Sequence, residues 1–160
     1  MNDDDARILN TILSTQRVAA LGTLHNGEPS VSMVPFAVQA ATGGLLIHVS
    51  TLATHTKDML GHPTISLLIT APLTPEVRPQ ALPRVTVRGA ASPLAPGDAG
   101  YAEARAAYLA RFPDSALMFG FADFSLFHII PENARLVGGF AQATSIRGDD
   151  IRALLSAPRP

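Results

Sequence analysis

The chain has 160 residues, no cysteine and a formal net charge of −1. Without cysteine it can form no disulfide, thiolate nucleophile or cysteine-ligated metal centre. Its near-neutral charge gives no global attraction for nucleic acid or an anionic membrane, and no apolar run approaches the ~20 residues that span a bilayer. The acidic start, "MNDDDARILN", lacks the basic and apolar parts of a secretory signal, so we expect a cytoplasmic protein.

The length and composition predict a single domain over residues 1–160. Proline and glycine are spread between short segments rather than gathered in a linker. Hydrophobic residues make up 47% of the chain and charged residues 16%. A small chain this apolar often has surface to hide in a partner, and we therefore expect a homodimer.

The first part of the chain predicts a helix and then a β-hairpin. Apolar residues in "ARILNTILSTQ" follow helical spacing, and Asp3 to Asp5 suit the cap and the positive end of the helix dipole. A carboxylate metal site is the less favoured alternative, because three consecutive side chains point in different directions. The segments "VAALGTL" and "SVSMVPFAV" predict two strands joined by the Asn-Gly turn of "HNGEP".

The middle of the chain predicts three further strands. These are "GLLIHVS" at 44–50, "TISLLIT" at 64–70 and "RVTVRGAASPL" at 84–94. Between the first two, a short helix is expected to end at Gly61 and Pro63. Residues 71–83 contain four prolines and predict a long irregular excursion.

The last part predicts an Ala-rich helix capped by Asp98, a helical turn in "DSALMFGF", a hairpin and a final helix, "GDDIRALLS". The hairpin is "FSLFHIIPENARLVGGFAQAT", which we expect to turn at "PENA". Hairpin-linked strands in so short a chain predict a mainly β, α+β fold. The expected architecture is a small antiparallel barrel of six or seven strands with peripheral helices.

The segment "VSTLATHTKDML", residues 49–60, is the strongest candidate site. If Ser50 or Thr51 caps the helix, the first free backbone N–H groups form an anion site suited to phosphate. The helical spacing predicts one face directed toward the barrel, with His55 on its flank and Lys57 nearer the polar side. That face comprises Leu52, Thr56, Met59 and Leu60.

Two arginines could complete a phosphate cradle. Arg17 directly precedes the first strand and Arg84 opens the fifth, so forked guanidinium groups would join Ser50, Thr56 and Lys57. The alternative is a capped surface helix with incidental polar residues, because arginines at strand ends are usually solvated.

The histidines and glycines favour structural roles. His48, His55 and His62 recur every seven residues but span a strand, a helix and a loop, so a metal site is not favoured. His25 indicates turn chemistry, and His128 a satisfied core histidine. Gly138-Gly139 in "VGGFAQA" lacks the third glycine and the helix of a dinucleotide loop, so a bulge or close backbone approach is expected.

The ordered segments "RVAALGTL", "SVSMVPFAV", "STLATHTKDM", "PRVTVRGAA" and "RLVGGFAQA" resemble the pyridoxamine 5′-phosphate oxidase-like FMN-binding split-barrel superfamily. Within it, the chain is most similar to the branch associated with haem utilisation. The resemblance covers about Arg17 to Ala143. It implies a split barrel and a homodimer that holds FMN at the subunit interface.

The resemblance also implies which residues bind the cofactor. One group would lie beside the flavin ring, a second would hold the phosphate and a third would reach the ring from the partner subunit. In chain order the implied residues are Arg17, Ala20, Leu21, Gly22, Thr23, Ser32, Met33, Val34, Pro35, Ser50, Thr51, Leu52, His55, Thr56, Lys57, Arg84, Gly138, Gly139 and Phe140.

The function implied is a flavoprotein oxidoreductase acting on a small-molecule redox substrate or NAD(P)H. The alternatives are a non-enzymatic module that binds flavin or haem, for haem utilisation, sensing or storage, and a scaffold without cofactor. Two departures from the family matter. Pyridoxamine oxidases carry a basic pair where this chain has Thr56-Lys57, and haem-degrading relatives carry a C-terminal haem-ligating histidine beyond the position of His128. Neither activity is therefore expected in its usual form, and no residue is assigned as catalytic.

Overall fold

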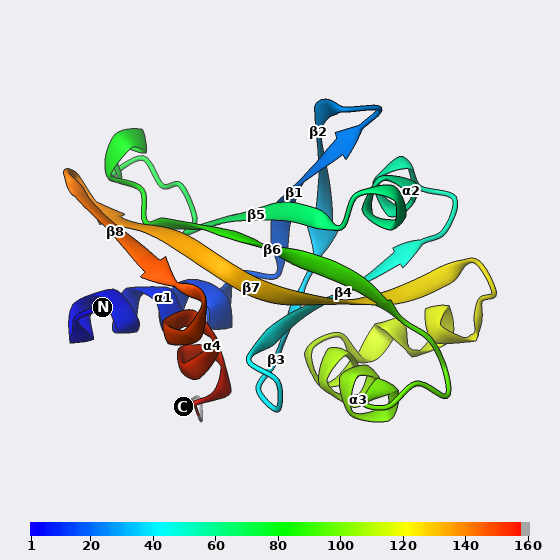
Figure 1. The fold of residues 1–160 in the computed structure, drawn as a ribbon. Coiled ribbons are helices and arrows are strands. Elements are labelled where there is room, and N and C mark those ends of the chain that lie inside the picture. Colours follow the sequence, from blue (N-terminus) through cyan, green and yellow to red (C-terminus); the bar gives the residue numbers. More distant parts are fainter. Residues whose placement is uncertain (158–160) are drawn as a thin grey trace.

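The computed structural model describes residues 1–157, which form one antiparallel sheet curled around a hydrophobic core. Within these residues eight strands are ordered β2-β1-β5-β6-β7-β4-β3, with β8 paired to β7. The end strands of this order, β2 and β3, are consecutive in the chain, so the sheet curls into a split barrel (Figure 1). The strands are β1 Val18–His25, β2 Glu28–Pro35, β3 Ala37–Gln39, β4 Gly44–Ser50, β5 Thr64–Thr70, β6 Arg84–Leu94, β7 Phe124–Gly139 and β8 Gln142–Arg147.

The predicted antiparallel split barrel of the α+β class is confirmed. The first hairpin turns as predicted, because Asn26 and Gly27 have φ of 52° and 83°, the left-handed pair that a two-residue hairpin loop requires. The strand count exceeds the prediction because the returning strand breaks at Phe36. Its first part pairs with β1 and its second part, β3, pairs with β4.

The prediction of a hairpin turn at "PENA" is wrong. Strand β7 runs without interruption through these residues, and its register against β6 shifts between Arg88 and Gly89, opposite Asn133 and Pro131. The tetrapeptide therefore forms a bulge, where proline is tolerated within a sheet. The chain turns later, at Phe140 and Ala141, and the expected irregularity at Gly138 is a second register shift between Val137 and Gly139.

The helices pack against the sheet as α1 Asp3–Thr15, α2 Thr54–Gly61, α3 Tyr101–Arg111 and α4 Gly148–Ser156, with 3₁₀ segments η1 Pro79–Ala81 and η2 Pro113–Gly120. Asn2 caps α1 by accepting from the N–H of Asp5, so the predicted acidic residues fill the first turn rather than the cap. Asp98 does not cap α3, which begins at Tyr101. Its carboxylate accepts instead from the N–H of Ala95. Among residues 1–157 no helix is long and apolar enough to cross a membrane.

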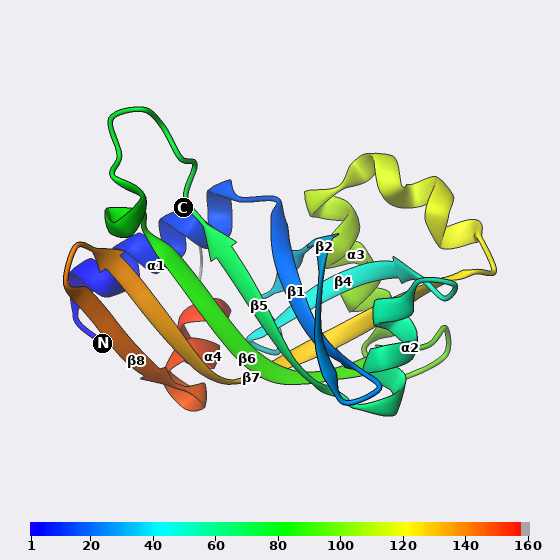
Figure 2. The ribbon, with the colours of Figure 1, turned by 90° about the horizontal axis from the view of Figure 1, so that it is seen from above.

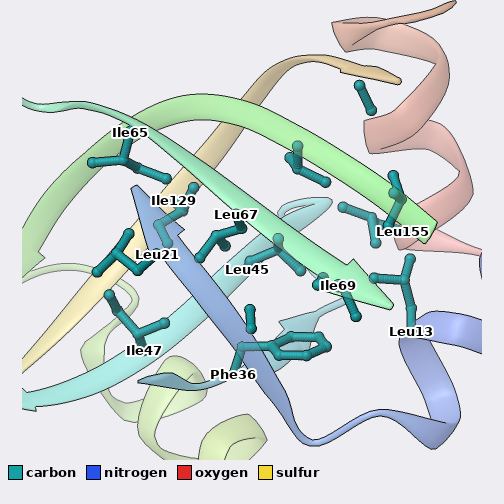
Figure 3. Close-up of a cluster of buried hydrophobic side chains, with 14 of the residues drawn as sticks. Leu13, Leu21, Phe36, Leu45, Ile47, Ile65, Leu67, Ile69, Ile129 and Leu155 are labelled. Atoms are coloured by element: carbon teal, nitrogen blue, oxygen red, sulfur yellow. The ribbon is translucent and has the colours of Figure 1, made fainter. Parts of the chain in front are cut away.

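The core lies inside the curl of the sheet (Figure 3). Side chains from several strands meet those of α1 and α4, including Leu13, Leu21, Leu67, Ile129 and Leu155. A smaller cluster lies between α3 and the far side of β4, around Leu46, Ala104 and Tyr108. Because β4 is buried on both faces, it reads as a continuous apolar run rather than an alternating one.

Candidate ligand-binding site

The predicted phosphate residues lie at opposite ends of the sheet within one chain. Strands β1 and β6 run parallel on either side of β5, so Arg17 and Arg84 share one end. Helix α2 contacts the other end, through the side chains of Thr23 and His25. Arg17 stacks over Phe112, with Cζ 4.9 Å from the ring centroid. A single chain therefore does not bring the two arginines to α2.

Two polar residues of α2, Thr56 and Asp58, form internal side-chain hydrogen bonds. Thr56 is 1% exposed, and its hydroxyl donates to the carbonyl of Ser50 at 2.6 Å. The predicted inward orientation of Thr56 is thus confirmed, although its hydroxyl is engaged by the main chain. The predicted side-chain cap is wrong, because the N-cap is Ala53, without a side-chain hydrogen bond.

The residues around the start of α2 shape the preceding loop. Ser50 Oγ accepts from the N–H of Leu52 at 3.2 Å, and Thr51 Oγ1 donates to the carbonyl of Asp123 at 3.2 Å. Leu52 and Leu60 are exposed, contrary to the predicted inward face, because the helix begins at Thr54 and is anchored by Thr56 and Met59. The hydroxyls of Ser50 and Thr51 therefore stabilise the loop that connects β4 to α2.

Asp58 was not predicted as a site residue, yet it is the centre of this end of the molecule. Its buried carboxylate accepts from Thr23 Oγ1 at 3.0 Å and from His25 Nδ1 at 2.8 Å. The hydrogen bond with His25, and then that with Thr23, hold the pKa of Asp58 below its usual value. Its partners lie 35 and 33 positions away, so no local pattern indicates the contact.

Thr54, His55 and Lys57 are the polar residues of α2 whose side chains form no such bond within residues 1–157. His55 Nε2 is buried and has no hydrogen-bond partner among residues 1–157. Burial lowers the pKa of His55, while the nearby Asp58 carboxylate acts in the opposite direction. Lys57 is exposed, which leaves its ammonium free for an external anion.

On the side of the sheet that faces away from the core, the region formed by β1, β2, β5, β8 and the parts of β6 and β7 that pair with β5 and β8 is here called the outer face. It carries an apolar half on β1, β2 and β5. One cross-strand row runs Met33, Ala20, Leu68, Thr86 and Arg135. Directly paired residues project on the same side of a sheet. Met33 is 63% exposed, and its neighbours on β1 are small, so this half is flat and apolar.

The other half of the outer face, on β6, β7 and β8, is basic. The next row runs Val31, Gly22, Ser66, Arg88 and Asn133, so a 74% exposed Val31 begins a row that reaches an exposed arginine. Figure 1 shows α1 and α4 below β5 to β7, and Figure 2 looks onto the opposite side, where these strands lie side by side. The basic residues of this half are Arg84, Arg88, Arg135 and Arg147.

The outer-face arginines differ in how they are engaged. Arg84 donates to the carbonyl of Leu82 at 2.9 Å, and Arg135 to Ser145 Oγ at 2.8 Å. Arg147 forms an ion pair with Asp150 at 3.1 Å. Each guanidinium has five N–H donors, so Arg84 and Arg135, which bond to neutral oxygens, retain both donors and charge for an acidic ligand.

The remaining predicted residues divide between the two faces by strand alternation. Ala20, Gly22 and Met33 contribute to the outer face, whereas Leu21 and Val34 are buried in the core and can offer a ligand their main chain. Pro35, paired with Val18, projects on the same side as Met33, whereas Ser32 projects to the other side and has a buried, unpartnered Oγ. Gly138, Gly139 and the exposed Phe140 follow the pairing of Val137 with Arg84.

The histidines make separate contacts in different parts of the molecule. Among residues 1–157 no group of three His, Asp or Glu side chains is placed to hold a metal ion. His128 Nε2 contacts Thr42 Oγ1 at 2.9 Å, as a satisfied histidine would. His25 and His48 each take part in contacts away from the outer face, with Asp58 and with Phe119 respectively.

Comparison with known proteins assigns the family. The model described as CREG, beta-barrel matches residues 1–152. The chain belongs to the CREG beta-barrel family. Its relatives include the chloroplastic haem oxygenase HOZ of Arabidopsis thaliana, 40% identical over 138 residues, and the haem oxygenase HutZ of Vibrio cholerae, 30% identical over 128 residues. These alignments cover 84% and 78% of this chain, and 40% and 70% of the two relatives.

A solved structure agrees with this membership. The haem-binding protein from Mycobacterium smegmatis matches with a TM-score of 0.83 at 29% identity, covering 96% of this chain and 62% of that one. A pyridoxamine 5′-phosphate oxidase-like protein from Listeria innocua shares the fold, with a TM-score of 0.59 at 18% identity, covering 84% of this chain and 98% of that one. The resemblance to the haem-utilisation branch of that superfamily is therefore confirmed. This chain spans 40% of the length of the Arabidopsis relative.

Proposed function

We propose that this protein is a haem-binding split barrel of haem utilisation that works as a homodimer. The observation that carries the proposal is the outer face, where a flat apolar half adjoins a basic half on the same sheet. A haem combines a broad apolar ring with two carboxylates, which is the complementary pattern. The family relatives named as haem oxygenases and as a haem-binding protein favour haem over other planar anions.

The residues of the outer face suit the two parts of a haem differently. The ring would lie toward the apolar half, and Arg88 and Arg135 would pair with the carboxylates across β6 and β7. No histidine of residues 1–157 projects from the rows that define this face. We therefore propose that a partner subunit or a small molecule supplies the iron ligand. Bound haem would supply the iron redox chemistry, and the arginines would orient it.

A second copy of the chain is the proposed occupant of the exposed part of the apolar half. Val31 and Met33 project side by side from the edge strand β2, with Leu68 further in, and edge residues of this kind are normally covered. Helices α1 and α4 cover the opposite side of the sheet, so the outer face is available for association.

Parallel titrations of the purified protein with haem and with FMN test the proposal. We expect saturable haem binding with a shifted Soret band, at about one haem per chain or fewer, and much weaker binding of FMN. Dialysis against excess apomyoglobin would separate a specific complex from loose adsorption. Rapid loss of all haem to apomyoglobin would overturn the proposal. So would a Soret band that matches free haem at every ratio of haem to protein.

The second candidate is an FMN-dependent oxidoreductase that acts on a small-molecule redox substrate or NAD(P)H. The observation that favours it is the exposed Lys57 near the start of α2, where backbone N–H groups are free as at any helix N-terminus. A yellow protein whose flavin bands are bleached anaerobically by NAD(P)H would establish it. Full loading with FMN and no affinity for haem would replace the first proposal by this one.

A further inference from the structure

A cavity of about 310 Å³ lies away from the outer face, between β4, the ends of β6 and β7, and the α3–η2 segment. Its walls are mainly aromatic and aliphatic, and none of its lining residues belongs to the outer face. The lining includes His48, Pro93, Tyr101, Phe119, Phe124 and Leu126. A volume near the lower end of the usual range for ligand pockets, about 300–1,000 Å³, suits one or two rings and excludes a haem.

His48 is a buried polar residue of this cavity with an unpartnered ring nitrogen. Its side chain projects from β4 and is 7% exposed, and its Nδ1 atom is buried with no hydrogen-bond partner among residues 1–157. Buried polar atoms of folded proteins are nearly always paired, because an unpaired one costs free energy. An aliphatic residue would fill the same position without that cost, so the imidazole indicates a binding role.

The aromatic surroundings fix the orientation of this imidazole. Phe119 stacks on it with a centroid distance of 3.8 Å and an interplanar angle of 6°. Tyr108 approaches edge-on at 5.7 Å, and Phe124 is tilted at 5.3 Å. Burial lowers the pKa of His48 to about 4, so the ring is neutral at physiological pH and presents one N–H donor and one acceptor nitrogen.

We propose that this cavity binds a small planar aromatic molecule of one or two rings, recognised through a single hydroxyl or N–H group by His48. A hydroxyl can donate or accept, so it satisfies either tautomer of the imidazole. The ring of the ligand would pack among the aromatic walls formed by Phe119 and Phe124. This site is independent of the proposed haem function, because it uses different residues on a different part of the sheet.

Phenol and benzene are the probes that test the proposal, since they differ by one hydroxyl. In the full chain we expect phenol to bind roughly tenfold more tightly than benzene, the usual scale for one hydrogen bond to a buried partner. Ring signals of His48, Phe119 and Phe124 should shift in NMR spectra during the phenol titration. Equal affinity for the two probes, or shifts confined to the outer face, would overturn the proposal.

Two variants distinguish the hydrogen bond of His48 from the volume that its ring occupies. His48→Phe keeps an aromatic ring on Phe119 and removes the nitrogen atoms, so the preference for phenol over benzene should disappear. His62→Phe changes an exposed histidine outside the cavity and should retain the preference. If His48→Phe does not fold, the ¹⁵N shift of the His48 ring in the wild-type protein decides: an unchanged shift at phenol saturation contradicts the proposal.

Discussion

The α2 end of the barrel and the outer face of the sheet use their polar groups in opposite ways. At the α2 end, Thr56 and Asp58 are buried and bonded to other parts of the same chain. On the outer face, exposed apolar residues adjoin arginines with spare donors. The polar residues that are close together in the sequence therefore stabilise the fold, whereas arginines scattered over three strands form the surface open to a ligand.

The largest effect is expected from the apolar half of the outer face. Replacing Val31 and Met33 together by aspartate places two charges where we propose a second copy docks. We expect the dimer dissociation constant to rise at least 100-fold, about 2.7 kcal/mol, as followed by sedimentation velocity across a concentration series. Folding should be preserved, because both side chains already face solvent.

The matched control for that double variant is Leu117→Asp, which alters an equally exposed apolar residue on η2. It should leave the dimer intact. A wild-type chain that remains monomeric at every concentration would remove the proposed docking surface and leave the apolar half to another partner.

The next effect concerns the α2 end. Thr56→Val preserves the shape of the side chain and removes its 2.6 Å hydrogen bond to the Ser50 carbonyl, which keeps the N–H of Ala53 as a donor at 3.2 Å. We therefore expect a loss of about 1–1.5 kcal/mol in the free energy of unfolding. Lys57→Ala, one residue further, should change it by less than about 0.5 kcal/mol because Lys57 is exposed. Urea denaturation measures both. A neutral Thr56→Val would mean that the hydroxyl is free for a ligand after all.

Local sequence rules predicted the parts of the fold that depend on neighbouring residues. The Asn26-Gly27 turn, the strand 84–94 and the irregular segment 71–83 each follow from propensities within a few positions. The turn predicted at "PENA" failed because pairing with β6 on one side and β8 on the other keeps β7 extended through it. The bulge at this point accommodates Pro131 within β7.

The candidate site was harder to predict, for a related reason. Helical spacing correctly directed Thr56 inward, but spacing cannot show that its hydroxyl is bonded to Ser50. Asp58 depends on partners more than 30 positions away. The outer face depends on register: three successive strand pairings bring Arg88 and Val31 onto the same surface. Such a surface is visible once the strand order is known.

A smaller effect is expected from the basic half of the outer face. Arg88→Ala and Arg135→Ala each remove one guanidinium from the proposed carboxylate contacts, and we expect haem affinity to fall about three- to tenfold for each. The loss should shrink as salt rises, since exposed charges are screened. Arg7→Ala, which breaks the exposed pair with Asp4 on α1, is the control and should change nothing. Equal haem affinity in all three variants would place the ligand elsewhere.

The last comparison concerns acid stability, because the two buried titrating groups act in separate pH windows. The pKa of His48 is lowered from 6.5 to about 4, so the stabilisation from its neutral form is complete above pH 6.5 and is lost as the pH falls toward 4. The pKa of Asp58 is lowered from 3.8, so its charged form stabilises the fold above that value, and this contribution is lost as the pH falls through the lowered pKa.

Thermal unfolding from pH 7 to pH 3 can resolve these windows with two variants. Asp58→Asn should lower Tm at neutral pH and flatten the profile below about pH 4, because the amide cannot lose a charge and still leaves His25 without its carboxylate partner. His48→Phe should flatten the profile between pH 6.5 and 4 instead. If Asp58→Asn retained the full acid loss below pH 4, other carboxylates would carry it, and the anchoring of α2 would rest on Thr56 rather than on Asp58.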